Sequence, residues 1–178
     1  MIHKMTNVEI GKILREMAGF YEMKNEPFKP RAYERAADSI DQLPEPVWET
    51  YKLQGPKALR TIPGVGVGIA EHLVELLKTG KLKKYAHFKK KTPIDLSGLT
   101  GLAGVGPKTA RDLYQKLGVK NIHDLERVIA SHKLQKIKGF GQKAEENLAL
   151  ALGARTKTPQ RYLLGNIFPV IEKLRLGL

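Results

Sequence analysis

The chain has 178 residues and a mass of 19.9 kDa, and 42% of its residues are hydrophobic while 28% are charged, which is enough to bury one core or two small ones. Its 31 Lys and Arg exceed its 18 Asp and Glu by 13, an excess that favours a polyanionic partner such as nucleic acid or an anionic membrane. The lack of cysteine excludes disulfides, cysteine-ligated zinc, iron–sulfur clusters and a thiol nucleophile. No apolar run reaches the roughly 18 to 20 residues of a membrane span. Charges also interrupt the first 20 residues, where a signal peptide would be apolar, so we expect an intracellular protein.

The positive charge is concentrated in the later part of the chain. Residues 1–51 hold 7 Lys or Arg and 9 Asp or Glu, a net charge of −2, whereas residues 52–178 hold 24 and 9, a net charge of +15. Seven of the lysines lie between Lys78 and Lys91, in a segment without an acidic residue. This segment is either a solvated linker or a surface that contacts phosphates.

Apolar residues recur at helical spacing along almost the whole chain, and strand-like alternation is nowhere sustained. The first helix follows an N-cap at Thr6 or Asn7 and carries apolar residues from Val8 to Met17. Proline and glycine residues mark the ends of later helices. We predict these helices over residues 31–43, 47–52, 57–61, 68–79, 82–90, 94–100, 107–117, 122–131, 134–137, 142–152 and 162–174.

A short motif occurs three times, as Ile62–Ala70, Leu102–Ala110 and Ile137–Ala144. Each copy has an apolar residue, a Gly-x-Gly segment with an apolar residue between the glycines, and an alanine soon after, and the first glycines are 40 and 35 residues apart. A short predicted helix enters each copy and a longer one leaves, so the glycines must reverse the chain within a few residues. The repeat predicts three helix-hairpin-helix motifs and an all-α protein of two small helical domains.

Such a hairpin directs free backbone N–H groups and the positive end of a helix toward one anion. Lys108 and Lys143 lie on the first turn of the second and third outgoing helices, where an ammonium can reach the same phosphate, and the first copy has Gly68 at this place. Contacts of this kind read no bases, so we expect sequence-independent binding of nucleic acid. For any single copy, the alternative is a tight turn that binds nothing. The predicted DNA-binding residues are Gly64, Val65, Gly66, Gly68, Lys81, Gly104, Val105, Gly106, Lys108, Thr109, Gly139, Gly141 and Lys143.

Two glycine-rich segments partly match the sequence motifs of nucleotide-binding loops but lack the secondary structure that such loops need. The segment from Gly64 to Gly68 lacks the third glycine of a dinucleotide fingerprint, Pro107 separates Gly106 from Lys108, and no predicted strand precedes either segment. The five histidines show no metal-ligand spacing. We therefore expect no nucleotide cofactor and no transition-metal site.

The sequence resembles the amino-terminal region of family X DNA polymerases, the group of DNA polymerase beta and its bacterial and archaeal relatives. The resemblance rests on segments in the order and spacing of the family: RAYERAA (31–37), LRTIPGVG (59–66), IAE (69–71), LKTGKL (77–82) and GVGPKTA (104–110). It implies a lyase-like domain over residues 1–91 on the downstream side of a DNA gap and a second helix-hairpin-helix domain over residues 92–153 on the primer side. It implies a tail over residues 154–178 that is similar to the start of a polymerase palm. It further implies a monomer that binds gapped or nicked DNA in repair, in the cytoplasm of a prokaryote and at its nucleoid.

The resemblance implies two activities, and the sequence departs from both. Polymerase chemistry needs a palm with three metal-binding aspartates, whereas Glu172 is the only acid after Leu152, so we expect no polymerisation by this chain alone. The lyase that removes a 5′-deoxyribose phosphate needs a lysine amine for a Schiff base, but His72 stands at that position, which leaves Lys84 or Lys81 as substitutes. The residues that match the family's 5′-phosphate pocket are Phe28, Lys29, Tyr33, His72 and Lys84, where Phe28 replaces a base-stacking histidine.

The family's hairpins also hold a monovalent cation, Na⁺ or K⁺, on backbone carbonyls. The matching residues here are Arg60, Ile62 and Val65 in the first hairpin, and Thr100, Leu102 and Val105 in the second. Three alternatives to a DNA-binding repair protein remain at this point: a lyase that acts at abasic ends, a scaffold whose hairpins bind a protein, and an RNA-binding module.

Overall fold

The computed structural model describes residues 2–137 and 139–157, and every regular element in these ranges is helical, which confirms the all-α prediction. The first part of the chain forms α1 (Asn7–Met23), α2 (Lys29–Asp41), α3 (Val47–Gln54), the 3-10 helix η1 (Pro56–Thr61), α4 (Val67–Thr79) and α5 (Lys83–Lys91). The second part forms α6 (Leu96–Thr100), α7 (Pro107–Leu117), α8 (Ile122–Ala130), the 3-10 helix η2 (Leu134–Lys136) and α9 (Gln142–Lys157). The helix predicted over 162–174 lies outside the described residues, as does the tail predicted over 154–178 except for residues 154–157, which end α9. Within the described ranges, none of the helices combines the length and the apolar character needed to cross a membrane.

Local sequence signals set the ends of several helices. α1 begins with a capping box, in which the Thr6 side chain accepts a hydrogen bond from the Glu9 N–H and the Glu9 carboxylate accepts one from the Thr6 N–H. α2 begins at Lys29, earlier than predicted, because Pro30 fits the first turn of a helix, where no N–H donor is needed. α4 ends at Gly80 with a φ of 68°, the left-handed conformation that glycine adopts most easily.

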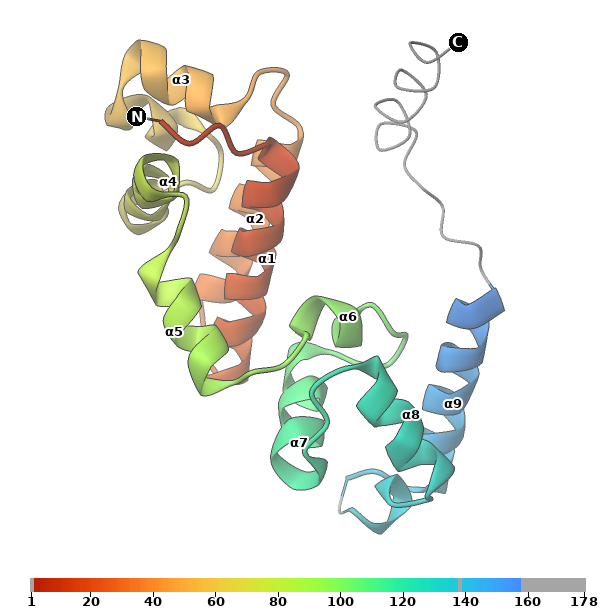
Figure 1. Ribbon diagram of the computed structural model, residues 1–178. Helices are drawn as coiled ribbons and strands as arrows, with labels where there is room; N and C mark the ends of the chain where they lie inside the picture. Colours follow the sequence, from red (N-terminus) through yellow and green to blue (C-terminus); the bar gives the residue numbers. More distant parts are fainter. Residues whose placement is uncertain (1, 138, 158–178) are drawn as a thin grey trace, which may run out of the picture.

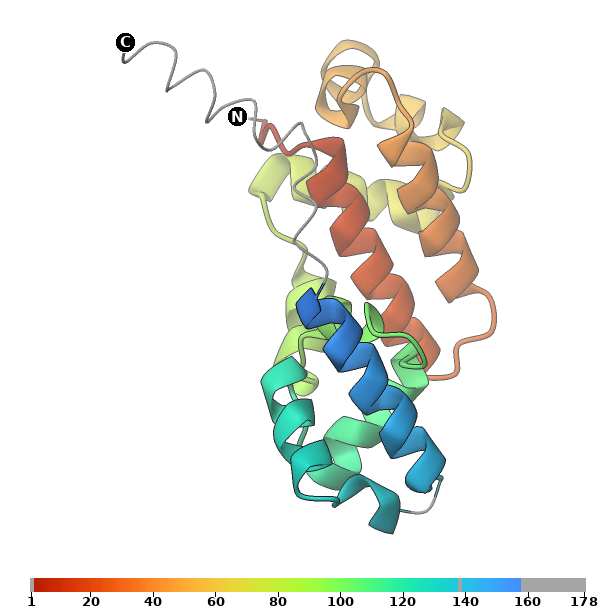
Figure 2. The same cartoon turned by 90° about the vertical axis from the view of Figure 1, so that its right-hand side faces the viewer.

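The helices form two bodies that meet at the C-terminal half of α1 (Figures 1 and 2). In the first body, α1 and α2 pack side by side, α3 and α4 lie near the N-terminal end of α1, and α5 returns toward its C-terminal end (Figure 1). In the second body, α6 and α7 contact α1, while α8 and α9 pack together on the far side. Both domains are therefore built against one helix.

One continuous cluster of buried side chains runs through both bodies. At the junction, Phe20 of α1 packs against Phe88 of α5 with ring centroids 5.4 Å apart. Leu96 of α6 packs directly on Gly19 of α1, where a Cβ would lie 2.6 Å from Leu96 Cδ2. The close approach of α6 to α1 thus depends on the missing side chain at Gly19.

A buried carboxylate on α1 also joins the two domains. Glu16 accepts hydrogen bonds from Tyr85 Oη over 2.6 Å and from Ser97 Oγ over 2.7 Å, and the Lys89 ammonium lies 3.5 Å from it. Burial disfavours the charged form, but the two hydrogen bonds and Lys89 outweigh burial and hold the pKa of Glu16 below its ordinary value. Because Tyr85 and Lys89 belong to α5 and Ser97 to α6, this charged group connects three helices.

A second polar contact crosses the junction at the end of α1. Arg111 Nη1 of α7 donates to the carbonyl of Met23, the last residue of α1, over 2.6 Å. α1 has no basic residue in its own last turn, so α7 supplies the cation that the free carbonyls of a helix C-terminus favour.

The lysine-rich segment is not a linker. Most of it is helix α5, which packs on α1 through the buried ring of Phe88 and the ion pair of Lys89 with Glu16. Its remaining lysines are therefore held at fixed places on the surface of a helix.

Candidate nucleic-acid interface

The three glycine motifs form the same backbone turn. In each copy, the residue between the glycines is buried under the turn. Its N–H donates to the carbonyl of the apolar residue that opens the motif, over 3.0 Å (Val65 to Ile62), 3.1 Å (Val105 to Leu102) and 2.9 Å (Phe140 to Ile137). The repeat seen in the sequence is therefore a repeat of the backbone.

The glycines have two different roles in this turn. The first glycine of each copy has a positive φ, which is 83° at Gly64, 85° at Gly104 and 99° at Gly139, and L side chains disfavour that conformation. The second glycine of the first two copies, Gly66 or Gly106, is extended and forms the N-cap of α4 or α7. The first position needs glycine for its conformation, whereas the second does not.

The first turns of α4 and α7 present free N–H donors. Neither N-cap glycine has a side chain that could accept from them, so these donors are left for water or an anion. A Cβ built on the hairpin glycines other than Gly64 would meet no atom within 4 Å, at Gly66, Gly68, Gly104, Gly106, Gly139 and Gly141. The backbone is open to a ligand at these positions.

The first hairpin is seated on α2. A Cβ at Gly64 would lie 2.8 Å from the backbone nitrogen of Ala36 and 3.0 Å from the carbonyl carbon of Arg35. The turn that carries Gly64 is thus packed against the same helix that carries Tyr33, one of the residues predicted for the 5′-phosphate pocket.

The third copy differs in charge from the other two. Four residues after the second glycine, the first two copies have buried alanines, whereas the third has Glu145, which is 5% exposed. Its carboxylate accepts from the Gln135 N–H over 3.2 Å and contacts His132 Nδ1 at 2.7 Å. Glu145 fixes η2 against α9, and it places a negative charge two residues from Lys143 on the turn where an anion would bind. The geometry favours the first two hairpins over the third as anion sites.

The structure places Lys108 beside acidic residues that the sequence analysis did not connect with it. Lys108 is exposed on the first turn of α7, and it lines a groove of about 390 Å³ together with Glu22, Glu26 and Glu34 of the first domain. Thr109 is half-buried behind it, while Lys81 and Lys143 are exposed elsewhere. The sequence does show that residues 1–51 carry a net negative charge. That these carboxylates lie near Lys108 follows only from the packing of α7 on α1.

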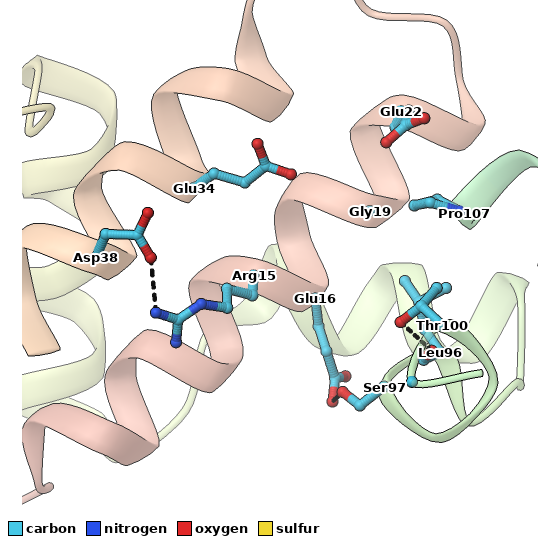
Figure 3. A pocket seen from close by; sticks show the side chains of 11 residues that line it. Arg15, Glu16, Gly19, Glu22, Glu34, Asp38, Leu96, Ser97, Thr100 and Pro107 are labelled. Carbon is cyan, nitrogen blue, oxygen red and sulfur yellow. Dashed lines mark hydrogen bonds and ion pairs between the residues drawn. The ribbon is translucent and has the colours of Figure 1, made fainter. Parts of the chain in front are cut away.

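A larger groove of about 570 Å³ adjoins it between α1, α2, α6 and α7, and we call it the α2-side groove (Figure 3). Four carboxylates and one guanidinium line it, from Glu16, Glu22, Glu34, Asp38 and Arg15. Arg15 is held by Asp38 over 2.8 Å, as Figure 3 shows. The excess of negative charge makes this groove unfavourable for DNA phosphates.

Four of the five residues predicted for the 5′-phosphate pocket come together around Tyr21 of α1. Tyr33 Oη and His72 Nδ1 are 2.7 Å apart, and the ring of Tyr33 lies 5.1 Å from that of Tyr21. The ammonium groups of Lys29 and Lys84 lie 5.0 Å and 5.6 Å from the centre of the Tyr21 ring. We call Tyr21, Lys29, Tyr33, His72 and Lys84 the Tyr21 cluster.

Phe28, the fifth residue predicted for the pocket, is not among the residues gathered around Tyr21, and Tyr21 itself was not predicted. Phe28 is the N-cap residue of α2, and its side chain is 83% exposed next to Lys29, so its ring is free to stack. Tyr21 is buried and was missed, because its place in the first helix reads as an ordinary core position.

The cluster favours the neutral forms of Tyr33 and His72. Burial, together with the neighbouring Tyr21, raises the pKa of Tyr33 far above its ordinary value. Burial and then the Lys84 ammonium lower the pKa of His72, against weaker effects of Glu75 and Glu71. A neutral His72 with its proton on Nε2 accepts from the Tyr33 hydroxyl at Nδ1. Its Nε2–H then remains as a donor near the Lys84 ammonium, an arrangement that suits a phosphate.

Two family models match the chain. One, described as a helix-hairpin-helix domain, matches residues 5–82, and the other, described as a SAM-like helix-hairpin-helix tandem, matches residues 96–154. Among curated proteins, a DNA polymerase/3′-5′ exonuclease PolX of Bacillus subtilis (strain 168) is 30% identical over 171 residues, which are 96% of this chain and 29% of the relative.

Proteins named DNA polymerase lambda match as well. Those of Arabidopsis thaliana and Rattus norvegicus are each 29% identical, over 132 and 134 residues, which are 74% and 75% of this chain and 24% and 22% of the relatives. The chain is homologous to the family X DNA polymerases. This confirms the resemblance to family X inferred from the hairpin motifs. The homology concerns the helix-hairpin-helix region of family X, since the chain spans less than a third of the length of these relatives.

Proposed function

We propose that the chain binds gapped or nicked DNA through its phosphates, and that it recognises the 5′-phosphate at the break, as the DNA-binding region of a family X polymerase acting in repair. The observation that carries this proposal is the Tyr21 cluster, in which the exposed ammonium groups of Lys29 and Lys84 and the half-buried His72 gather around the buried rings of Tyr21 and Tyr33. Lys29 also forms an ion pair with Glu26 over 3.0 Å, so Lys84 is the ammonium of the cluster that a phosphate reaches without competition from a carboxylate of the described residues. A terminal phosphate carries about two negative charges near pH 7 and offers three acceptor oxygens. The negative charge and the acceptor oxygens of such a phosphate match the positive charge and the N–H donor of the Tyr21 cluster.

The hairpins supply the rest of the proposed contact. The first turns of α4 and α7 offer free N–H donors under open glycine backbone, which suits internal phosphates of the two strands. Donors of this kind carry no information about base sequence. Binding is therefore expected to be independent of sequence and strongly dependent on salt.

The test is equilibrium binding by fluorescence anisotropy across a salt series. Three DNAs are compared: a duplex with a one-nucleotide gap bearing a 5′-phosphate, the same gap without the phosphate, and the intact duplex. The proposal predicts preference for the phosphorylated gap. Equal binding to all three would reduce the chain to a non-specific clamp, stronger binding to an RNA duplex would indicate an RNA-binding module, and the absence of salt-sensitive binding would favour a protein scaffold.

A lyase acting at abasic ends is the second candidate, and it depends on the position of Lys84. The amine of Lys84 is close enough to lower the pKa of His72 and is the cluster's second ammonium. Borohydride would trap the Schiff base of a lyase as a covalent adduct. Because His72 stands at the position of the nucleophilic lysine and imidazole forms no stable iminium, any adduct has to form at a substitute amine such as Lys84. We expect no adduct above the level seen with Lys84→Ala, and an adduct that disappears in this variant would establish the lyase.

We also propose that a monovalent cation binds the backbone carbonyls of the first two hairpins. The carbonyls of Ile62 and Leu102 each accept one N–H within the turn, which leaves each a second lone pair for a cation. The other proposed ligands are carbonyls of Arg60, Val65, Thr100 and Val105. Replacing K⁺ by choline at the same ionic strength is expected to weaken binding to DNA, and equal affinities in the two salts would contradict the cation.

A further inference from the structure

A third groove lies at the domain junction, on the side of α1 that faces α5. Its volume is about 250 Å³, and α1, α5, the segment after α5 and α7 form its walls. Its lining includes three aromatic rings and three cationic side chains, from Phe20, Phe88, Tyr114, Lys24, Lys91 and Arg111. None of the residues that line this α5-side groove is acidic, in contrast to the α2-side groove.

Two of its three cations are available to a ligand. Among the described residues, no carboxylate forms an ion pair with Lys24 or Lys91, and the Lys24 ammonium lies 4.4 Å from the centre of the Phe88 ring. Arg111 shares its charge with Asp112 at 3.1 Å. Ammonium groups beside an aromatic surface suit a ligand that joins an anion to a flat ring.

The α5-side groove is continuous with the Tyr21 cluster. The rings of Tyr21 and Phe88 meet edge to face with centroids 5.4 Å apart, Lys84 lies over the first ring, and Lys24 lies over the second. Lys84, Phe88 and Lys91 are spaced by four and three residues along α5, so they share one face of that helix. Positive charge thus extends from the cluster into the groove.

We propose that the α5-side groove binds one unpaired nucleotide at the DNA break, with its base against Tyr114 and its phosphate at Lys24 and Lys91. The groove is smaller than the roughly 300 Å³ at which sites for drug-sized ligands begin, so it takes a single base and not a longer segment. Tyr114 is half-buried and offers part of its ring, whereas Phe20 and Phe88 form the floor. This inference rests on the proposed function, because the Tyr21 cluster fixes the 5′-phosphate beside the groove.

The unpaired nucleotide has two sources with the same chemistry, and photo-cross-linking separates them. The full chain is irradiated with a phosphorylated one-nucleotide gap that carries 5-iododeoxyuridine either at the unpaired template position or as a one-nucleotide 5′-flap. A paired position ten nucleotides downstream is the control. We expect one of the two probes to cross-link to Tyr114 or Phe88, as mapped by mass spectrometry. Cross-links from both probes only to other parts of the chain would overturn the proposal.

Matched lysine variants test the phosphate contact. Lys91 lines the groove, whereas Lys90 lies on the same helix and does not. Lys91→Ala is expected to weaken binding of the cross-linking substrate at least about tenfold, as for the loss of one charged hydrogen bond, and Lys90→Ala less than about twofold. Equal effects of the two variants would refute binding of the nucleotide in the α5-side groove, while leaving the proposed function intact. Absence of a preference for the 5′-phosphate in the wild-type chain would instead refute the proposed function.

Discussion

The carboxylate of Glu16 accepts a hydrogen bond from Ser97 Oγ over 2.7 Å, and this bond crosses from the first helix of one domain to the first helix of the other. Glu16→Ala removes the acceptor for Ser97 and Tyr85 and leaves both hydroxyls at a buried junction. We expect the free energy of unfolding at pH 7 to fall by about 2 to 3 kcal/mol, measured by urea denaturation. Ser97→Ala, which removes one bond only, is expected to cost about 1 kcal/mol.

The contribution of Glu16 also has a defined pH dependence. Because the pKa of Glu16 is held below its ordinary value of 4.5 in the folded chain, its stabilising effect is complete above that value and is lost as pH falls through the lower folded pKa. The difference in stability between the wild-type chain and Glu16→Ala is therefore expected to shrink below about pH 4.5. A difference that stayed constant down to pH 3 would contradict the ionised state of Glu16.

Substitutions at the two glycines of the second hairpin are expected to distinguish effects on stability from effects on DNA binding. Gly104 has a φ of 85°, so Gly104→Ala is expected to cost about 1 to 2 kcal/mol of stability. Gly106 has an ordinary φ of −86°, and a Cβ there meets nothing. Gly106→Ala is thus expected to leave thermal stability unchanged while weakening binding to DNA, because its methyl group covers the free donors of α7. Loss of stability in both variants, with equal binding, would show that the hairpin is only a turn.

Salt dependence tests the lysines of the hairpins. Lys108→Ala and Lys143→Ala are each expected to weaken binding equally for every DNA sequence and to reduce the slope of log affinity against log salt by about 1. Lys12→Ala, an exposed lysine of α1 away from the hairpins, is the control with an unchanged slope. Since Glu145 lies near Lys143, we expect the smaller loss of affinity there, at a similar change of slope. Unchanged slopes for both hairpin variants would mean that neither lysine contacts a phosphate.

The carboxylates beside Lys108 are expected to oppose binding to DNA. Glu34 is exposed and lines the same groove as Lys108, so it reduces the attraction of that ammonium for a phosphate. Glu34→Gln should raise the affinity for gapped DNA by about two- to fivefold at low salt, the range expected of an exposed ion pair. Glu45→Gln, which removes the same charge away from this groove, is the comparison. A weaker complex with Glu34→Gln would indicate that Glu34 positions Lys108 instead of competing for it.

Binding of a 5′-phosphate should be linked to protonation of His72. Burial and Lys84 lower the pKa of His72 in the free chain, and a bound phosphate would favour the charged ring and raise that pKa. Preference for the phosphorylated gap is therefore expected to increase as pH falls from about 8 to 6.5, above the pKa near 6 of the phosphate itself. The increase should vanish in His72→Gln and persist in His87→Gln. A flat profile for the wild-type chain would exclude His72 from the phosphate site.

Much of the local structure could be predicted because its causes are local. The Gly-x-Gly motif predicted a tight reversal of the chain, and Gly64, Gly104 and Gly139 have the positive φ values that this reversal needs. Thr6 caps α1 through a motif contained in four residues. Helix ends without such a signal were placed less well. α9 continues to Lys157, past Gly153, because a glycine without a left-handed turn or a following proline does not stop a helix.

The residues that were missed act through contacts between distant segments. Tyr21 gathers the cluster only because α2, α4 and α5 pack around α1, and nothing in its neighbourhood along the chain distinguishes it from a core residue. Glu16 offered a signal of its own, since a carboxylate on the buried face of α1 needs partners. Those partners, at positions 85 and 97, could not be named without the fold.

The carboxylates of the α2-side groove and the lysines of the α5-side groove flank the same helix, α1, so the domain junction has a transverse dipole. In the field of a polyanion, this dipole produces a torque that turns the α5 side toward the DNA before any contact forms. A larger share of diffusive encounters then begins in a productive orientation. Salt shortens the range of this effect to about 10 Å at 0.1 M ionic strength, so the acidic residues of the first domain should increase the association rate constant most at low salt.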